Sequence, residues 1–143
     1  MADSLFDTFE KWASLVMRRS SHEMSRFSRS QDLSIGQLNV LLWLYNHGPR
    51  EVSAIYDQAH GSPAAASQMV ERLVQEGLVE RSESPTDRRV RLVSLTARGK
   101  TLAEQSLEAR LGWLRDRMDS LAPAQRHQLE EAFKILLTVS TED

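Results

Sequence analysis

The sequence predicts a mainly α-helical fold with one small β-hairpin, in which a central region lies between two longer helical regions. Apolar residues recur at helical spacing over most of the chain, which is the primary signal of amphipathic helices. Helix-start and helix-stop residues divide the central region into short helices. Two short extended runs, 78–83 and 90–95, enclose a turn signal and predict the hairpin. Residues 1–143 fit a single domain with a substantial core.

Composition narrows the class of protein. Cysteine is absent, which excludes disulfides, thiolate metal sites and thiol-based sensing. No apolar run approaches membrane-spanning length, and the acidic N-terminal stretch is unlike a signal peptide, so we expect a cytoplasmic protein without membrane contact. The four histidines lack metal-ligand spacing, and no serine lies in a nucleophile elbow. We therefore expect no enzyme, no metal and no cofactor.

The central region begins with a well-marked helix. Ser34 and Gln37 fit a capping box, and Leu33 and Leu38 fit the accompanying hydrophobic staple. Gly48 and Pro49 end this helix. Its expected buried face consists of Leu38, Leu41, Leu42 and Tyr45.

Two shorter elements follow. A helix over 53–59 leads into a tight turn at His60-Gly61. Ser62 then caps a helix that has Pro63 at its first position and ends before Gly77. The inward residues expected for this helix are Ala66, Val70, Leu73 and Val74. The order helix, short helix, helix and hairpin over 34–96 describes a winged helix-turn-helix, whose second short helix fits the major groove of DNA.

Charge gathers in the hairpin. The chain carries a formal net charge of −2, yet residues 81–100 hold six basic and two acidic side chains. A basic segment in an acidic protein indicates a local contact with a polyanion, and a solvated charged loop is the alternative. We expect Arg88 and Arg91 to contact phosphate, and we expect Asp87 to pair with Arg89 and stiffen the hairpin.

The helix over 62–76 is the candidate for reading bases. Gln can contact adenine through two hydrogen bonds, Ser can serve either groove edge, and Ala methyl groups can touch the thymine methyl. The alternative interpretation is that the Ala and Ser residues are ordinary surface residues of a helix. We expect Glu71 and Glu76 to face away from phosphate. The expected DNA-binding set in this helix is Ser62, Ala64, Ala65, Ser67, Gln68 and Arg72.

The hairpin region carries a distinctive motif, in which GLVER is followed by DRR, VSLT and the glycine at position 99. With this motif as the most specific part, residues 34–100 resemble the MarR (multiple-antibiotic-resistance regulator) family. The resemblance implies that the arginine at position 89 enters the minor groove while Asp87 orients the wing. The residues Ala59, His60 and Gly61 depart from the family pattern, as does Tyr56, and this leaves the exact base contacts open.

The flanking regions, 1–30 and 101–143, match that family in layout and predict a dimerisation region. A stripe along a helix over 4–29 comprises Leu5, Phe9, Trp12 and Val16. A heptad seam comprises Leu107, Leu111, Leu114, Met118 and Leu121, and a final stripe comprises Leu129, Ala132, Phe133 and Leu136. Pairing of two subunits would bury this surface, whereas a monomeric bundle is the alternative.

The resemblance also implies a small aromatic or phenolic effector between the dimerisation helices and the winged region. The candidate lining residues are Trp12, His22, Trp43 and Trp113, and core or interface packing is their alternative role. The sequence thus predicts a homodimeric regulator that binds double-stranded DNA at a pseudo-palindromic operator and acts as a repressor. The alternatives are an activator of the same fold and a winged-helix protein-interaction module without specific DNA binding.

Overall fold

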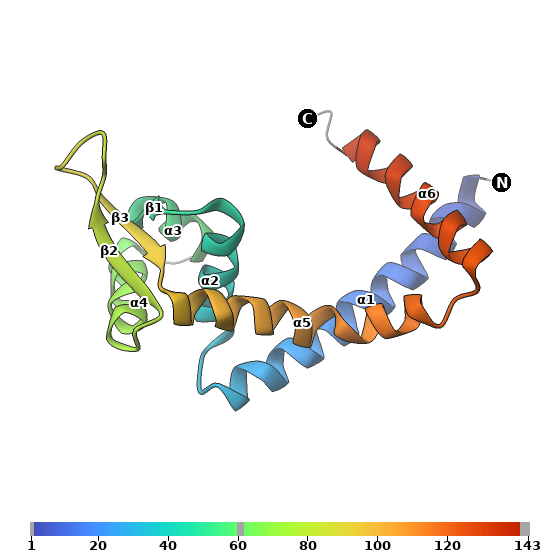
Figure 1. Ribbon diagram of the computed structural model, residues 1–143, viewed down its shortest axis with the longest axis horizontal. Coiled ribbons are helices and arrows are strands. Elements are labelled where there is room, and N and C mark those ends of the chain that lie inside the picture. Colours follow the sequence, from blue (N-terminus) through green and yellow to red (C-terminus); the bar gives the residue numbers. More distant parts are fainter. Residues whose placement is uncertain (1, 60–61, 141–143) are drawn as a thin grey trace. The chain divides into compact units, whose positions relative to one another are not determined.

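The computed structural model describes residues 2–59 and 62–140, and within these ranges the chain is mainly helical with one small antiparallel sheet (Figure 1). This confirms the predicted fold class. The chain forms two compact units, residues 1–110 and 111–143. The helices are α1 (Ala2–Ser30), α2 (Ile35–His47), α3 (Val52–Ala59), α4 (Pro63–Gln75), α5 (Ala97–Asp119) and α6 (Pro123–Ser140), and the strands are β1 (Arg50–Glu51), β2 (Val79–Glu83) and β3 (Arg91–Leu95). None of the helices in the described ranges combines the length and the apolar character needed to cross a membrane.

Helix α2 begins and ends where the sequence predicts. The Ser34 hydroxyl accepts a hydrogen bond from the Gln37 N–H at 3.1 Å, and the Gln37 side-chain oxygen accepts from the Ser34 N–H at 2.8 Å. Gly48 follows the helix with a φ of 73°, and its N–H donates to the Leu44 carbonyl at 2.8 Å. Only a residue without a Cβ adopts this left-handed conformation readily, so glycine stops the helix there.

The predicted buried face of α2 is wrong at one position. Tyr45 lies at the surface, where its hydroxyl donates to Glu104 Oε1 at 3.3 Å. Electrostatic repulsion from the Glu104 carboxylate raises the pKa of Tyr45. The side chains of Val40 and Leu44 are buried as well, because α2 is enclosed on most of its circumference and is not an amphipathic surface helix.

The sheet has the strand order β1-β3-β2, with both pairs antiparallel. The predicted hairpin is present as β2 and β3, in which Val79 pairs with Leu95 and Glu83 with Arg91. Strand β1 was not predicted, since two residues are too few to show an alternating pattern. Arg50 of β1 pairs with Val93 of β3, so β1 forms the edge of the sheet that leads into α3.

Helix α4 forms as the sequence predicts. The Ser62 hydroxyl accepts from the Ala65 N–H at 3.2 Å, and Pro63 occupies the first turn. Ala66, Val70 and Leu73 are buried, while Val74 is half-buried. Gly77 has a φ of 68° and lets the chain leave the helix for β2. The predicted turn at 60–61 and the side chains at positions 56 and 59 lie outside the described residues.

The start of helix α5 packs closely on Leu78, in the connection between α4 and β2. The Gly99 N–H donates to the Thr96 hydroxyl at 3.0 Å, so Thr96 caps the helix. A Cβ at Gly99 would overlap the main-chain carbonyl of Leu78. Within α5, Leu102 and Ala103 are buried, whereas Leu111 of the predicted seam is 42% exposed.

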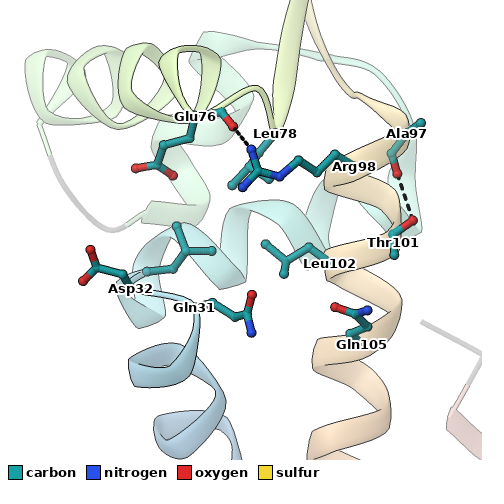
Figure 2. Close-up of a pocket in the computed structure, with 10 residues that line it drawn as sticks. Gln31, Asp32, Glu76, Leu78, Ala97, Arg98, Thr101, Leu102 and Gln105 are labelled. Atoms are coloured by element: carbon teal, nitrogen blue, oxygen red, sulfur yellow. Dashed lines mark hydrogen bonds between the residues drawn. The ribbon is translucent and has the colours of Figure 1, made fainter.

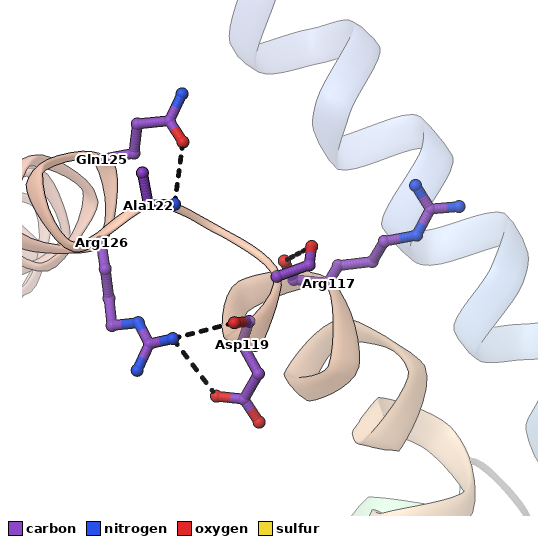
Figure 3. A network of polar contacts seen from close by, with 6 residues as sticks. Arg117, Asp119, Ala122, Gln125 and Arg126 are labelled. Atoms are coloured by element: carbon purple, nitrogen blue, oxygen red, sulfur yellow. Dashed lines mark hydrogen bonds and ion pairs between the residues drawn. The ribbon is translucent and has the colours of Figure 1, made fainter.

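Polar contacts close the connection between α5 and α6 in the unit 111–143 (Figure 3). Arg126 Nη2 donates to the Asp119 carbonyl at 3.0 Å and lies 3.9 Å from the Asp119 carboxylate. The Gln125 side-chain oxygen accepts from the Ala122 N–H at 3.1 Å, which caps α6 in the turn that contains Pro123.

We predict that Gly99→Ala lowers the free energy of unfolding by about 2 kcal/mol, because the added methyl group must displace backbone rather than a flexible side chain. Urea denaturation measures this value. Gly36→Ala is the matched control, since its Cβ would meet the mobile end of Met69 and alanine favours a helix. Equal stability changes in the two variants would contradict the close approach at Gly99.

Candidate nucleic-acid interface

The exposed side of α4 collects the residues expected to read bases. Ser62, which caps the helix, and the predicted α4 residues are all exposed, whereas Val70 and Leu73 of α4 belong to the hydrophobic core. The uncharged members at the start of the helix leave its surface free of large side chains. The exposed predicted residues are Ser62, Ala64, Ala65, Ser67, Gln68 and Arg72. The structure thus brings the predicted set together on one helix, and its contacts with bases stay a prediction.

The sequence set Glu71 apart from this face, since its side chain was expected to point away from phosphate, but the residue is exposed beside the predicted set. The Glu71 side chain is 54% exposed and lies one turn after Gln68 and one turn before Gln75, which are both exposed as well. Its carboxylate pairs with Arg81 of β2 at 3.3 Å. The three- and four-residue spacing from the two glutamines could have revealed this placement from the sequence.

The loop between β2 and β3 is a tight, internally bonded turn that projects beyond the helices of its unit (Figure 1). Ser84 is buried, and its hydroxyl accepts from the Thr86 N–H at 3.3 Å. The Val90 N–H donates to the Asp87 carbonyl at 3.0 Å, which closes a four-residue turn. Arg88 and Arg89 therefore occupy the two central positions of a β-turn at the tip of the wing.

The predicted ion pair between the side chains of Asp87 and Arg89 is wrong. In the part of the chain that the structure describes, the Asp87 carboxylate instead accepts from the main-chain N–H of Arg89 at 2.9 Å. The reason is that 87–90 is a turn, so alternate residues do not point the same way as they would in a strand. Asp87 contacts the backbone and leaves the Arg89 guanidinium without this partner. A role for Asp87 in orienting the wing stays a prediction.

The arginines of the wing fall into two groups. Arg91 lies directly opposite Glu83 in the hairpin register and pairs with it at 3.5 Å. Arg88 and Arg89 are exposed, and neither guanidinium has an ion-pair partner within residues 2–59 and 62–140. Unbalanced positive charge is thus concentrated at the tip of the wing, and the charge of Arg91 is partly offset.

A pocket of about 590 Å³ lies where α1 ends, α4 ends and α5 begins (Figure 2). The Arg98 side chain extends across it, and Arg98 Nη1 donates to the Glu76 carbonyl at 2.7 Å. Glu76 is the residue that caps the end of α4. The pocket is lined by Gln31, Asp32, Leu33, Glu76, Leu78, Ala97, Arg98, Thr101, Leu102 and Gln105.

None of the four predicted effector residues lines this pocket. Trp12 is 39% exposed near the start of α1, and His22 is exposed further along the same helix. Trp43 is half-buried and stacks on His47, with ring centroids 5.2 Å apart. Trp113 is half-buried in the other unit. A ligand-binding role for these four residues stays a prediction.

Helices α3 and α4 form a helix pair, and α4 exposes a polar face. A hairpin with arginines at its tip follows. This arrangement defines the winged helix-turn-helix class of proteins. The model of the MarR family matches residues 33–90. The chain is 32% identical over 109 residues to the HTH-type transcriptional repressor MdtR of Bacillus subtilis, covering 76% of this chain and 70% of that protein. This chain belongs to the MarR family.

Further relatives match over nearly the whole chain. An HTH-type transcriptional regulator of Mycobacterium bovis, Mb0904, is 29% identical over 129 residues, which is 90% of each chain. The crystal structure of RV1404 from Mycobacterium tuberculosis aligns with a TM-score of 0.75 at 30% identity, covering 99% of this chain and 96% of that one. The similarity therefore extends through the flanking helices as well as the winged region.

We predict that Arg88→Ala and Arg89→Ala each reduce the slope of log affinity against log salt for duplex DNA by about one unit, because each removes one unpaired cation. The Glu83→Gln, Arg91→Gln double variant is the charge-balanced control, and we expect it to change the slope less than either single variant, because Glu83 partly offsets the charge of Arg91. Fluorescence anisotropy at several salt concentrations measures the slopes. A larger change in the double variant than in the single variants would contradict the grouping of the arginines.

Proposed function

We propose that this chain is a homodimeric, sequence-specific DNA-binding protein that regulates transcription, acting as a repressor. The observation that carries the proposal is the exposed, largely uncharged face of α4 beside a wing whose tip holds Arg88 and Arg89 without ion-pair partners in the described ranges. The two surfaces divide the work. The α4 face offers groups that match base edges, and the wing offers cations that match phosphate or a narrow minor groove.

Large exposed apolar side chains support the dimer. In α1, Leu5 is 77% exposed, Phe6 65% and Phe9 47%, and in α6 Ile135 is 65% exposed. Exposed apolar surface of this extent is typical of a protein–protein interface. We therefore assign residues 34–100 to DNA binding, and 1–30 with 101–143 to dimerisation. A two-fold dimer would present two α4 helices about 34 Å apart, which fits a pseudo-palindromic site.

Repression is favoured over activation by one comparison. The relative MdtR is named a transcriptional repressor, and a dimer bound across promoter DNA represses simply by excluding the polymerase. A winged-helix module that binds protein instead of DNA is the second candidate. It gives no reason for two exposed arginines at the wing tip, so we place it behind DNA binding.

The direct test is selection of genomic fragments bound by the purified protein. We expect a small set of promoter fragments to be enriched over random DNA. Gln68→Ala should change the preferred base at one position of each half-site, whereas Arg89→Ala should weaken binding to all fragments alike, because phosphate and groove-width contacts carry little base information. Similar sequence-independent losses in both variants would contradict the division of roles, and no enrichment at all would overturn the proposed function.

We further propose that a small aromatic or phenolic acid releases the protein from DNA by binding in the pocket at the end of α4. Arg98 is the only cationic side chain among the residues that line this pocket in the described structure, and it also holds the Glu76 carbonyl. A carboxylate drawn to Arg98 would compete for this hydrogen bond and loosen the end of α4. The pocket thus supplies a physical link between an effector and the base-reading helix.

We predict that benzoate or 4-hydroxybenzoate raises the melting temperature of the wild-type protein and weakens its binding to a selected fragment, and that Arg98→Ala abolishes both effects. Thermal denaturation and anisotropy titrations measure them. Lys100→Ala is the control, because it removes a cation of α5 that does not line the pocket. If Arg98→Ala still responds like the wild type, the effector site lies elsewhere.

A further inference from the structure

The outward face of α4 carries one carboxylate, that of Glu71, beside neutral polar groups and the cation Arg72. This carboxylate is paired with a residue outside its own helix. Glu71 Oε2 lies 3.3 Å from Arg81 Nη2, although the two residues belong to α4 and β2. Arg81 sits in the middle of β2, paired with Val93 of β3, so its main chain is fixed by the sheet. The pair therefore ties the middle of the base-reading helix to the first strand of the wing.

Stability gives little reason for this pair. The side chains of Arg81 and Glu71 are 42% and 54% exposed, and exposed pairs of this kind contribute about 0–1 kcal/mol. A carboxylate on a surface that meets DNA also repels the phosphate backbone. Arg81 offsets this repulsion, so the main effect of the pair is on the charge of the surface proposed to face DNA.

The pair leaves one oxygen of the Glu71 carboxylate available to accept a hydrogen bond. Arg81 engages Oε2, and Glu71 Oε1 has no hydrogen-bond or ion-pair partner within the described ranges. An ionised carboxylate accepts hydrogen bonds and cannot donate them. A base that meets Oε1 must therefore present a donor in the major groove.

Major-groove chemistry narrows the choice of base. Guanine presents two acceptors there, and thymine presents an acceptor and a methyl group. Adenine has a donor next to the N7 acceptor, which a carboxylate repels. Cytosine presents its N4 amino group as a donor without an adjoining acceptor on the same base. The favoured partner of a fixed carboxylate is thus the cytosine of a C·G pair.

We propose that Glu71 is a specificity-determining residue that selects a cytosine in each half-site, and that Arg81 is the positioning residue that holds its carboxylate. This inference rests on the proposed DNA-binding function and adds a base-selecting acid to the residues already proposed for α4. Gln68 lies one turn earlier on the same helix, so it reads a neighbouring base pair.

The test is repeated selection from a library of randomised duplex DNA, performed with the wild type, Glu71→Gln and Glu80→Gln. We expect a cytosine preference of about tenfold at one position in the wild type, in keeping with the discrimination of a good base contact. Glu71→Gln should lose this preference and keep the others, because an amide can also donate. Glu80→Gln removes an equal charge from an exposed residue of β2 and should keep every preference.

Arg81 is tested by rescue. Arg81→Ala should relax the same position and weaken binding, most strongly at low salt, because Glu71 then repels phosphate without compensation. Arg81→Lys should restore the cytosine preference in part, since an ammonium group can also hold the carboxylate. A purely structural role of Arg81 would alter the thermal stability and leave the base preference unchanged, which would overturn its positioning role.

Two outcomes separate the inference from the function on which it rests. If the wild type selects a defined site and Glu71→Gln selects the same bases with uniformly tighter binding, Glu71 is a passive charge and the inference fails alone. If the wild type selects no site, the proposed function fails and the inference fails with it. Circular dichroism of each variant confirms that the compared proteins are folded.

Discussion

A short junction between residues 76–78 and 96–99 sets the geometry on which the winged region depends. Three consecutive carbonyls that follow α4 accept hydrogen bonds from the start of α5. Arg98 donates to Glu76 at 2.7 Å, the Thr96 hydroxyl donates to Gly77 at 2.7 Å, and the Thr96 N–H donates to Leu78 at 3.1 Å. These carbonyls lie beyond the last turn of α4, and the start of α5 supplies a hydrogen-bond donor for each of them. The same few residues end α4, begin the hairpin and begin α5.

This junction holds together the two surfaces that the proposed function assigns to DNA binding. Helix α4 and the wing are joined through it, and the Glu71–Arg81 pair adds a second tie between them. The paired cations Arg81 and Arg91 are partly neutralised by Glu71 and Glu83. Unpaired charge is left at the wing tip, where under the proposed function it would add affinity but little sequence information. The proposal therefore assigns the choice of site to the face of α4.

Local signals in the sequence predicted the elements well. The capping box at Ser34, the cap at Ser62 and the glycine stop at Gly48 depend on bonds within a few residues, so they can be recognised without knowledge of the fold. What failed depended on contacts distant in sequence or on loop conformation. Tyr45 was placed in the core because the sequence interpretation assumed a single buried apolar face for α2. The helix is in fact enclosed on most sides, and its exposed part includes Tyr45.

The candidate interface shows the same limit. The exposed residues of α4 could be predicted because the apolar pattern of the helix shows which face is buried. The partners of charged groups could not, since Arg91 meets Glu83 through strand register and Arg81 meets Glu71 across two elements. Asp87 contacts the main chain of Arg89 because the wing tip is a turn, a detail that the alternation of an extended strand conceals.

Hydroxyl-radical footprinting on a selected fragment distinguishes a two-fold dimer from other modes of binding, because it maps the position of every protein contact along the DNA. We expect two protected half-sites with centres about 34 Å apart, each flanked by protection where a wing meets the backbone. A single continuous or unstructured footprint would contradict a two-fold dimer that reads DNA with α4 and clamps it with the wing.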